Sequence, residues 1–272
     1  MQNRRLGGGL MLTCVAALLM LGAASPARSK SVRDVKVQGA DGPIWARLLA
    51  GAADGKRPAV IILHGRESLE KLPSPYTHYA EALAARGIDA WLVSHYDSAD
   101  AQAMSSPDRA ARVKYFGDHL KSWSNRIHDV VGHILQREDA SGKVGLLGFS
   151  NGGFLAVMSA ANDPRVTALV VFYGGISGPK AEIAQLPPLL ALHGEADRVI
   201  AIAAGTALVA RARALGGQAE LVTYPGRTCV RFRSVESRRQ RCIGPRAVVS
   251  ANANEVTGQG GSAFTPSLDW FA

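Results

Sequence analysis

The residue best suited to chemistry in this sequence is a serine placed between two glycines. Ser150 stands in Gly148-Phe149-Ser150-Asn151-Gly152, after the apolar run 144–147 and before an apolar helical stretch at 153–160. Strand, tight turn and helix form the context in which a G-x-S-x-G pattern marks a nucleophile elbow. Such an elbow would hold the Ser150 hydroxyl above the sheet, and the N–H of Asn151 would face a developing oxyanion. The alternative interpretation is a glycine-rich turn with an incidental serine.

Two further segments should bring polar groups to the same edge of the sheet. Arg66 follows the apolar run 58–63 through His64-Gly65, and its backbone N–H could be the second oxyanion donor. Its side chain could meet an acidic substrate or simply be solvated. Asp197 lies a few residues past a predicted strand at 188–192, where the chain order Ser, Asp, His expects the acid. The alternative for Asp197 is a cap on the following turn.

The general base is the weak point of this arrangement. A serine hydroxyl needs a base to take its proton and a carboxylate to orient that base. The chain has seven His, and none lies beyond His193. His64, His95 and His193 fall near predicted strand ends, and His193 is the best candidate for a substitute base, although a structural role is the alternative for each. Without a base, we expect activity at Ser150 to be lowered by several orders of magnitude.

The spacing of apolar runs predicts the framework. Continuous apolar runs are typical of strands buried on both faces. Here they alternate with helical stretches, which favours a mostly parallel sheet with helices on both faces. An antiparallel hairpin around Asp41-Gly42-Pro43 should precede that sheet. The expected strands are 32–37, 44–49, 58–63, 88–93, 144–147, 166–172, 188–192 and 219–224, and the expected helices are 79–86, 108–137, 153–160 and 202–215, with a break of the second helix near Gly117 as an alternative.

Several pieces of the sequence together resemble the dienelactone hydrolase family of α/β-hydrolases. The resemblance covers about residues 32–226 and implies the α/β-hydrolase fold and hydrolysis of an ester or lactone through an acyl-enzyme. The best-known members of that family have cysteine as the nucleophile, whereas Ser150 suits a general esterase. The matching pieces are Ile62-Leu63-His64-Gly65-Arg66, Gly148-Phe149-Ser150-Asn151-Gly152-Gly153, Phe172-Tyr173-Gly174-Gly175, Leu192-His193-Gly194-Glu195-Ala196-Asp197 and Tyr224-Pro225-Gly226.

The sequence departs from the family after Gly226. The family places its catalytic histidine there, but this chain continues with an Arg-rich run and then a Gly/Ser/Ala/Asn stretch without helical period. We hypothesise that the chain from about Arg227 onward is translated out of frame, because 227–232 can be encoded so that a one-base shift reads Ala-His-Ala-Phe-Asp-Phe. The tail 227–272 is expected to be poorly ordered, and whether its Cys229 and Cys242 form a disulfide is left open.

Charge and hydropathy identify the two ends of the chain as different from the segment between them. The 272 residues have a net charge of +9, but most of it comes from residues 1–30, which have no acid, and from seven Arg in the tail. The segment between is nearly neutral, so the charge does not indicate an anionic partner. Residues 1–27 have the charged start, short apolar core and small residues before Ala27 that are typical of a cleaved secretion signal. We therefore expect one α/β-hydrolase domain over 28–226 in a periplasmic or secreted protein.

Three classes of function remain after this reading. No cluster of His, Cys or Asp has metal-ligand spacing, and no glycine-rich segment fits a P-loop or dinucleotide site, so neither a metal nor a cofactor is expected. A serine hydrolase acting on a small ester or lactone is favoured. A non-catalytic α/β-hydrolase-like protein that binds an acyl or hydrophobic ligand is the alternative. A basic tail that binds nucleic acid or an anionic surface is the third, and export argues against nucleic acid.

Overall fold

The computed structural model describes residues 31–71, 73–178, 182–225, 227–228 and 242–243. The predicted signal segment 1–27 and nearly all of the predicted tail 227–272 lie outside the described residues. Within the described residues, no helix is long and apolar enough to span a membrane.

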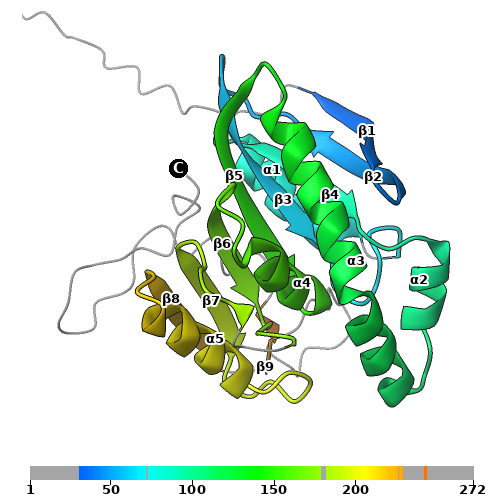
Figure 1. Ribbon diagram of the computed structural model, residues 1–272, viewed down its shortest axis with the longest axis vertical. Coiled ribbons are helices and arrows are strands. Elements are labelled where there is room, and N and C mark those ends of the chain that lie inside the picture. Colours follow the sequence, from blue (N-terminus) through cyan, green and yellow to red (C-terminus); the bar gives the residue numbers. More distant parts are fainter. Residues whose placement is uncertain (1–30, 72, 179–181, 226, 229–241, 244–272) are drawn as a thin grey trace, which may run out of the picture.

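Eight strands form one sheet in the order β1-β2-β4-β3-β5-β6-β7-β8 (Figure 1). β1 pairs antiparallel with β2 and β2 antiparallel with β4, while every other pair in this sheet is parallel. The predicted hairpin and the mostly parallel sheet are therefore confirmed. The strands are β1 (Val32–Gly39), β2 (Gly42–Leu49), β3 (Arg57–Leu63), β4 (Asp89–Ser94), β5 (Ala140–Phe149), β6 (Val166–Phe172), β7 (Leu189–Gly194) and β8 (Ala219–Tyr224), with a short separate pair of β9 (Arg227–Thr228) and β10 (Cys242–Ile243).

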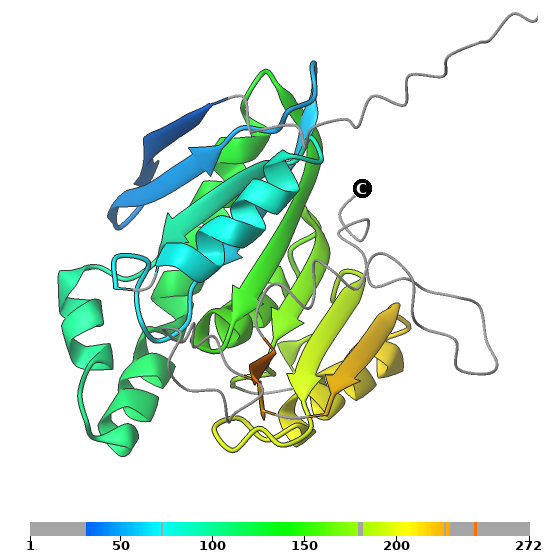
Figure 2. The same cartoon turned by 180° about the vertical axis from the view of Figure 1, so that it is seen from behind.

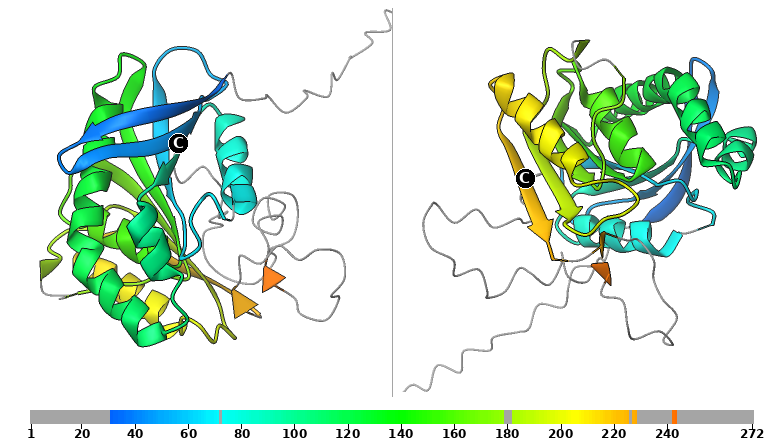
Figure 3. Two further views of the ribbon diagram at one scale, coloured as in Figure 1. Left: turned by 90° about the vertical axis from the view of Figure 1, so that its right-hand side faces the viewer. Right: turned by 90° about the horizontal axis from the view of Figure 1, so that it is seen from below.

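Helices cover both faces of the sheet (Figures 2 and 3). One face packs against α3, α4 and α5, and the other against α1, so that the buried side chains fall into two clusters separated by the sheet. This is the layered arrangement that the alternation of strands and helices predicts. The helices are α1 (Pro73–Ala84), α2 (Ser98–Met104), α3 (Arg109–Leu135), α4 (Asn151–Ala160) and α5 (Ala203–Ala214).

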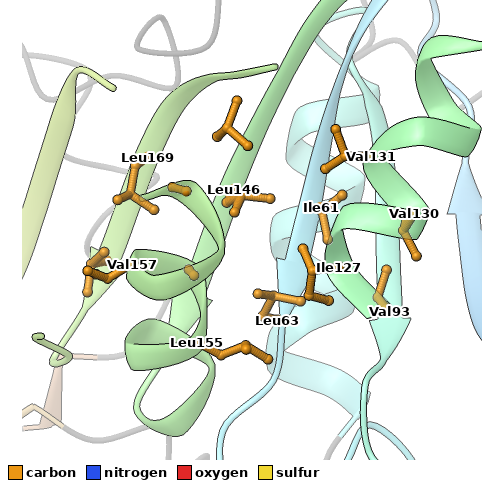
Figure 4. Packing of buried hydrophobic residues seen from close by; sticks show 14 of the residues in the cluster. Ile61, Leu63, Val93, Ile127, Val130, Val131, Leu146, Leu155, Val157 and Leu169 are labelled. Atoms are coloured by element: carbon orange, nitrogen blue, oxygen red, sulfur yellow. The ribbon is translucent and has the colours of Figure 1, made fainter. Parts of the chain in front are cut away.

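The larger cluster fixes the central strands against α3 and α4. Ile61, Leu146 and Leu169 from β3, β5 and β6 meet Ile127 of α3 and Leu155 of α4, and all five side chains are fully buried (Figure 4). Each such side chain contributes about 1.5–3 kcal/mol of transfer free energy. The elbow after β5 thus adjoins a fully buried part of the core.

Most predicted helix ends lie within two residues of the observed ones. Three larger features of the helices each have a physical reason. α1 begins at Pro73, six residues before the predicted start, because the first turn of a helix does not use the N–H groups that proline lacks. α3 runs unbroken through the exposed Gly117, since the buried face of the helix outweighs the roughly 1 kcal/mol cost of one glycine. α2 was not predicted; its start is fixed by a capping box between Asp97 and Asp100.

A cluster of ion pairs ties together the amino ends of the central strands. Arg57 at the start of β3 contacts Asp89 at the start of β4 (Nε–Oδ1 2.7 Å) and Asp139 just before β5 (2.5 Å). Arg137 contacts Asp139 at 2.6 Å, and the N–H of Gly51 donates to Asp89 at 2.8 Å. Burial alone would raise the pKa of Asp139, but its hydrogen bonds to the two guanidinium groups hold that pKa below its usual value.

Candidate active site

Ser150 occupies a strained backbone position directly after β5. Its φ of 54° and ψ of −118° lie in a region that residues other than glycine rarely adopt. The conformation is fixed from both sides, because the Ser150 N–H donates to Phe172 O at 3.0 Å and the Ser150 carbonyl accepts from Gly153 N–H at 2.8 Å. The half-buried side chain makes no capping hydrogen bond to α4. Strain of this kind is typically retained where a side chain must be presented for function.

The two glycines of the elbow are required by close backbone contacts. A Cβ on Gly148 would collide with the carbonyl of Gly152, and a Cβ on Gly152 would collide with the carbonyls of Leu63 and His64. These contacts bring the end of β3 and the start of α4 directly against the turn. They explain why both positions are glycine and why the serine between them has so little freedom.

The two predicted oxyanion donors lie on the two sides of this turn. Asn151 is the first residue of α4, so its backbone N–H has no acceptor within the helix and points out of the helix start. Gly65 lies beside the elbow, since a Cβ on it would be 3.4 Å from Ser150 Cβ, and Arg66 follows at once. The Arg66 side chain is turned to solvent and pairs with Glu67 at 2.6 Å. Arg66 thus follows directly on the residue that lies beside the elbow, while its guanidinium is paired with Glu67.

Two buried tyrosines hold these donor segments. The Tyr76 hydroxyl accepts the Gly65 N–H at 2.9 Å, and the Asn151 side-chain amide donates to the Tyr96 hydroxyl at 3.3 Å. Burial raises the pKa of Tyr76 to about 12 and raises that of Tyr96 as well, so both phenols stay protonated. The sequence could not predict these two hydrogen bonds, since no local pattern shows which backbone group or side chain a tyrosine will reach.

Tyr96 is in turn supported by the buried carboxylate of Asp100 on α2. The Tyr96 ring packs on Trp123 (centroids 4.8 Å apart), and the Trp123 Nε1–H donates to Asp100 at 3.0 Å. The Tyr115 hydroxyl donates to the same carboxylate at 3.0 Å, and Arg126 lies 3.3 Å from it. A fully partnered network of this type fixes its members in single conformations.

Asp197 lies in the turn after β7 and uses one carboxylate oxygen to stabilise that turn. Its Oδ1 accepts from the N–H groups of Val199 (2.8 Å) and Ile200 (3.0 Å). Capping the turn and serving as a catalytic acid are therefore compatible, because the turn does not engage Oδ2. β7 is two strands from β5, which places Asp197 on the order of 10 Å from Ser150. In a catalytic triad, one imidazole occupies such a gap.

Among the described residues, none of the three candidate histidines lies between Ser150 and Asp197 with a hydrogen bond to Ser150. His64 and His95 are buried and stacked with centroids 3.8 Å apart, and His64 Nδ1 lies 2.8 Å from Gly65 O. Burial lowers the pKa of His64 to about 4 and lowers that of His95 well below its usual value. His193 is equally buried, and its Nε2 lies 2.8 Å from Ile200 O. Its ring is bound into the loop before α5 and adjoins Gly205 of that helix.

The described residues contain no group of three or more His, Cys, Asp or Glu side chains that could hold a metal ion. The carboxyl edge of the sheet brings together a strained serine, candidate backbone donors beside it and a carboxylate two strands away. That set can do nucleophilic chemistry on an ester carbonyl.

Comparison with known proteins places the chain among hydrolases. The family model described as "Dienelactone hydrolase family" matches residues 46–233. An Escherichia coli K12 protein named "Putative carboxymethylenebutenolidase" is 28% identical over 118 residues, which are 40% of this chain and 40% of that protein. The chain thus matches less than half the length of that relative.

Solved structures share the α/β-hydrolase fold. The dienelactone hydrolase-like promiscuous phosphotriesterase P91 from metagenomic libraries superposes with a TM-score of 0.62 at 19% identity, covering 74% of this chain and 84% of that one. Thermogutta terrifontis esterase 2 phosphoramylated by tabun superposes with a TM-score of 0.55 at 18% identity, covering 74% and 85%. At these identities the likeness shows the fold alone.

Proposed function

Because the chain belongs to the dienelactone hydrolase family, we propose that it is a serine hydrolase that attacks carboxylic esters or lactones through an acyl-enzyme on Ser150. In this proposal Asp197 is the acid of the triad, and the backbone N–H groups of Arg66 and Asn151 stabilise the oxyanion. The observation that supports it most directly is the backbone of Ser150, strained at φ 54° at the carboxyl edge of the sheet. A turn serving only as a connection has no reason to keep a non-glycine residue there.

The relatives favour an electrophilic carbonyl or phosphoryl centre as the target. One is named for a butenolide-cleaving activity, one is a phosphotriesterase, and one is an esterase phosphoramylated by tabun. A nucleophilic oxygen beside two backbone donors suits both kinds of centre, since each develops negative charge on oxygen in the transition state. We propose a small ester or lactone as the substrate.

The activity of this chain is proposed to be impaired by the missing histidine. Among its 272 residues no His follows His193, and Nε2 of His193 is already bonded to Ile200 O. Acylation of Ser150 would then depend on solvent to take its proton, and hydrolysis of the acyl-enzyme would lack an activated water. The gene sequence tests the out-of-frame hypothesis: it fails if no one-base shift near Arg227 restores a histidine.

A fluorophosphonate label and p-nitrophenyl acetate separate the enzyme from the non-catalytic alternative. We expect the label on Ser150 in the natural chain and none in Ser150→Ala, with turnover of the ester slow in the former. Label without any turnover indicates a site that acylates but does not deacylate. If neither reagent modifies Ser150 while the folded protein still binds an acyl ligand, the non-catalytic ligand-binding function replaces this proposal.

We further propose that the protein is exported and cleaved after Ala27. The supporting features are Arg4 and Arg5, the short apolar core and the small residues before Ala27. The mass of the protein recovered from a periplasmic extract tests this, and retention of residues 1–27 there contradicts it.

A further inference from the structure

β1 forms one side edge of the sheet and is regular over its whole length. It is the last strand at that side of the described sheet and pairs there with β2 alone (Figure 1). Its register with β2 is continuous over residues 32–39, and the strand contains no proline. Bulges, prolines and charged side chains are the usual devices that prevent further pairing at an edge. β1 has only charged side chains, so its charges decide which strand can pair with it.

The hydrogen-bond pattern determines which residues of β1 face outward. The Ala50 N–H donates to Ser31 O at 2.9 Å, directly before the register of β1 with β2 begins. Residues of an antiparallel strand direct their N–H and C=O groups alternately to one side and to the other. Ser31 and every second residue after it therefore bond to β2, and the residues between them present their backbone groups to solvent. The outward residues, whose side chains share one face and are all exposed, are Val32, Asp34, Lys36 and Gln38.

A second copy of the same strand can pair with these groups in only a few registers. A closed dimer has two-fold symmetry, so the two β1 strands must run antiparallel. Outward residues must be opposite outward residues, which leaves registers that differ by two residues. One of them places Asp34 opposite its own copy and another places Lys36 opposite its own copy, and like charges directly opposite are destabilising. The register between these two places Asp34 opposite Lys36 of the second copy, once on each side of the axis.

That register also pairs the other outward residues. It is centred on Val35 and places Val32 opposite Gln38 of the second copy, whereas registers shifted further leave some outward residues unpaired. Each opposed pair of outward residues exchanges two backbone hydrogen bonds.

The side chains on the outer face extend the charge complementarity onto β2. Asp34 is paired with Arg47 at 2.8 Å, and Lys36 Nζ lies 5.5 Å from the centre of the Trp45 ring. In the dimer, a row of side chains would run from Arg47 through Asp34 to Lys36 and Trp45 of the second copy. Cation and anion alternate along this row, and it ends on an indole ring that is 55% exposed in the single chain. The exposed tryptophan thus gains a neighbour in the same register that pairs the charges.

We infer that β1 is the docking edge for a second copy of this chain, which forms a two-fold dimer whose two sheets are joined through their β1 strands. The partner is identified by charge, because a copy of this strand supplies both Lys36 and Asp34 at the spacing that the outward residues require. Ser150 follows β5, four strands from β1, so the dimer leaves the carboxyl edge of the sheet open. The inference is therefore independent of the proposed chemistry.

Charge reversal with restoration tests the register. In sedimentation velocity, the natural chain should be a monomer at about 1 µM and a dimer at about 500 µM, as a small interface implies. Asp34→Lys places lysines opposite each other twice, and Lys36→Asp does the same with aspartates, so each should raise the dissociation constant at least about tenfold. The double variant Asp34→Lys/Lys36→Asp restores opposite charges and should dimerise within about fivefold of the natural chain. Such recovery excludes misfolding as the cause of the single effects.

Asp118→Lys is the matched control, because Asp118 forms a similarly exposed pair with Lys114 on α3. It should leave the dissociation constant unchanged. Residue-resolved amide hydrogen exchange locates the interface. Dilution from dimer to monomer should speed exchange at Asp34 and Lys36 and leave Val35, which bonds to β2, unchanged.

Three results would overturn the inference. They are a chain that stays monomeric at every concentration, a dimer that the single reversals do not weaken, and a dimer whose newly protected amides lie outside β1. None of them bears on the labelling of Ser150, so the proposed hydrolase function is tested separately.

Discussion

A polar cluster at the amino ends of the parallel strands is fully paired, whereas two buried polar groups near the elbow at their carboxyl ends are not. At the amino ends, Arg57, Asp89, Asp139 and Arg137 pair with one another, and Asp89 also accepts the N–H of Gly51. At the carboxyl ends, the described residues leave the Tyr173 hydroxyl and His64 Nε2 without partners. Ser150 and Tyr173 are also two of the three non-glycine residues with positive φ in the described chain.

The paired cluster at the amino ends stabilises the folded state, whereas the strained and unpaired groups at the carboxyl ends lower its stability. A satisfied ion-pair cluster can only hold strands together, because no donor or acceptor remains for a ligand. Orphan hydroxyls and strained backbones destabilise the free protein, and they persist where binding or chemistry makes use of them. Each of the following variants should therefore affect stability in the direction set by its end of the sheet.

The largest effect on stability is expected at the amino ends. Asp89→Ala removes one of the two carboxylates that pair with the Arg57 guanidinium, whose side chain is only 10% exposed, and leaves Asp139 as the other. Breaking one half of such a buried pair costs about 3–5 kcal/mol, so urea unfolding should show a loss of that size. The matched control is Asp34→Ala, which breaks an exposed pair with Arg47 and should leave the unfolding midpoint unchanged. Equal effects of the two variants would contradict the contrast.

The next effect is a pH dependence that comes from His64. Its folded pKa of about 4 lies below the ordinary value of 6.5, so the unfolded chain binds a proton first as the pH falls. The stability that the neutral His64 contributes is fully present above about pH 6.5 and is lost on acidification toward pH 4. Between pH 7 and pH 5, the free energy of unfolding should fall by about 2 kcal/mol for this reason. The pKa of His95 is also lowered on folding, so His95 adds to the loss of stability at low pH.

Urea unfolding at pH 7, 6 and 5 measures this slope, with His64→Gln as the comparison. The variant should have a flatter profile over this range. A slope identical to that of the natural chain would mean that the buried imidazole of His64 does not set the acid sensitivity.

A smaller effect with the opposite sign is expected at the elbow. Ser150→Gly removes the Cβ from a backbone at φ 54° and ψ −118°, which glycine tolerates. After the greater freedom of glycine in the unfolded chain is subtracted, the free energy of unfolding should rise by about 1 kcal/mol. Ser150→Ala keeps the strain and should unfold like the natural chain. Both variants lose the label, so a stabilised Ser150→Gly shows that strain is maintained for the side chain at this position.

The smallest effect is expected from His193. Because its Nε2 is bonded to Ile200 O, His193→Gln should change the rate of Ser150 acetylation by no more than about twofold, although it loosens the loop before α5. The rates are compared at equal folded fractions, measured by circular dichroism. A loss of tenfold or more would make His193 the substitute base and revise the picture of an impaired site.

The sequence allowed prediction of those features that local patterns determine. β6 begins and ends where its apolar run does, because a largely buried strand cannot include polar residues cheaply. β8 also spans the predicted residues, although it is a half-buried edge strand that includes Glu220 and Thr223. The conformation at Ser150 followed from its flanking glycines. The hydrogen-bond partners of Tyr76 and Tyr96 could not be predicted, since they depend on which distant segments the sheet brings together.

The motif Phe172-Tyr173-Gly174-Gly175 was visible in the sequence at a strand end. It indicated family resemblance but not the direction of a hydroxyl group. Asp100 was missed for a related reason: a carboxylate in a short, unpredicted helix becomes notable only when Trp123 and Tyr115 from α3 converge on it.

The collisions that exclude a Cβ from Gly148 and Gly152 affect how such sequences should be interpreted over evolutionary time. Selection against misfolding would preserve these glycines in a descendant that no longer turns over any substrate, since the sheet and α4 cannot close without them. A gene that has drifted into disuse could therefore keep its most recognisable signature long after its catalysis has gone. For surveys of genomes, the position most informative about living activity is the distal imidazole, which nothing in the framework obliges a lineage to retain.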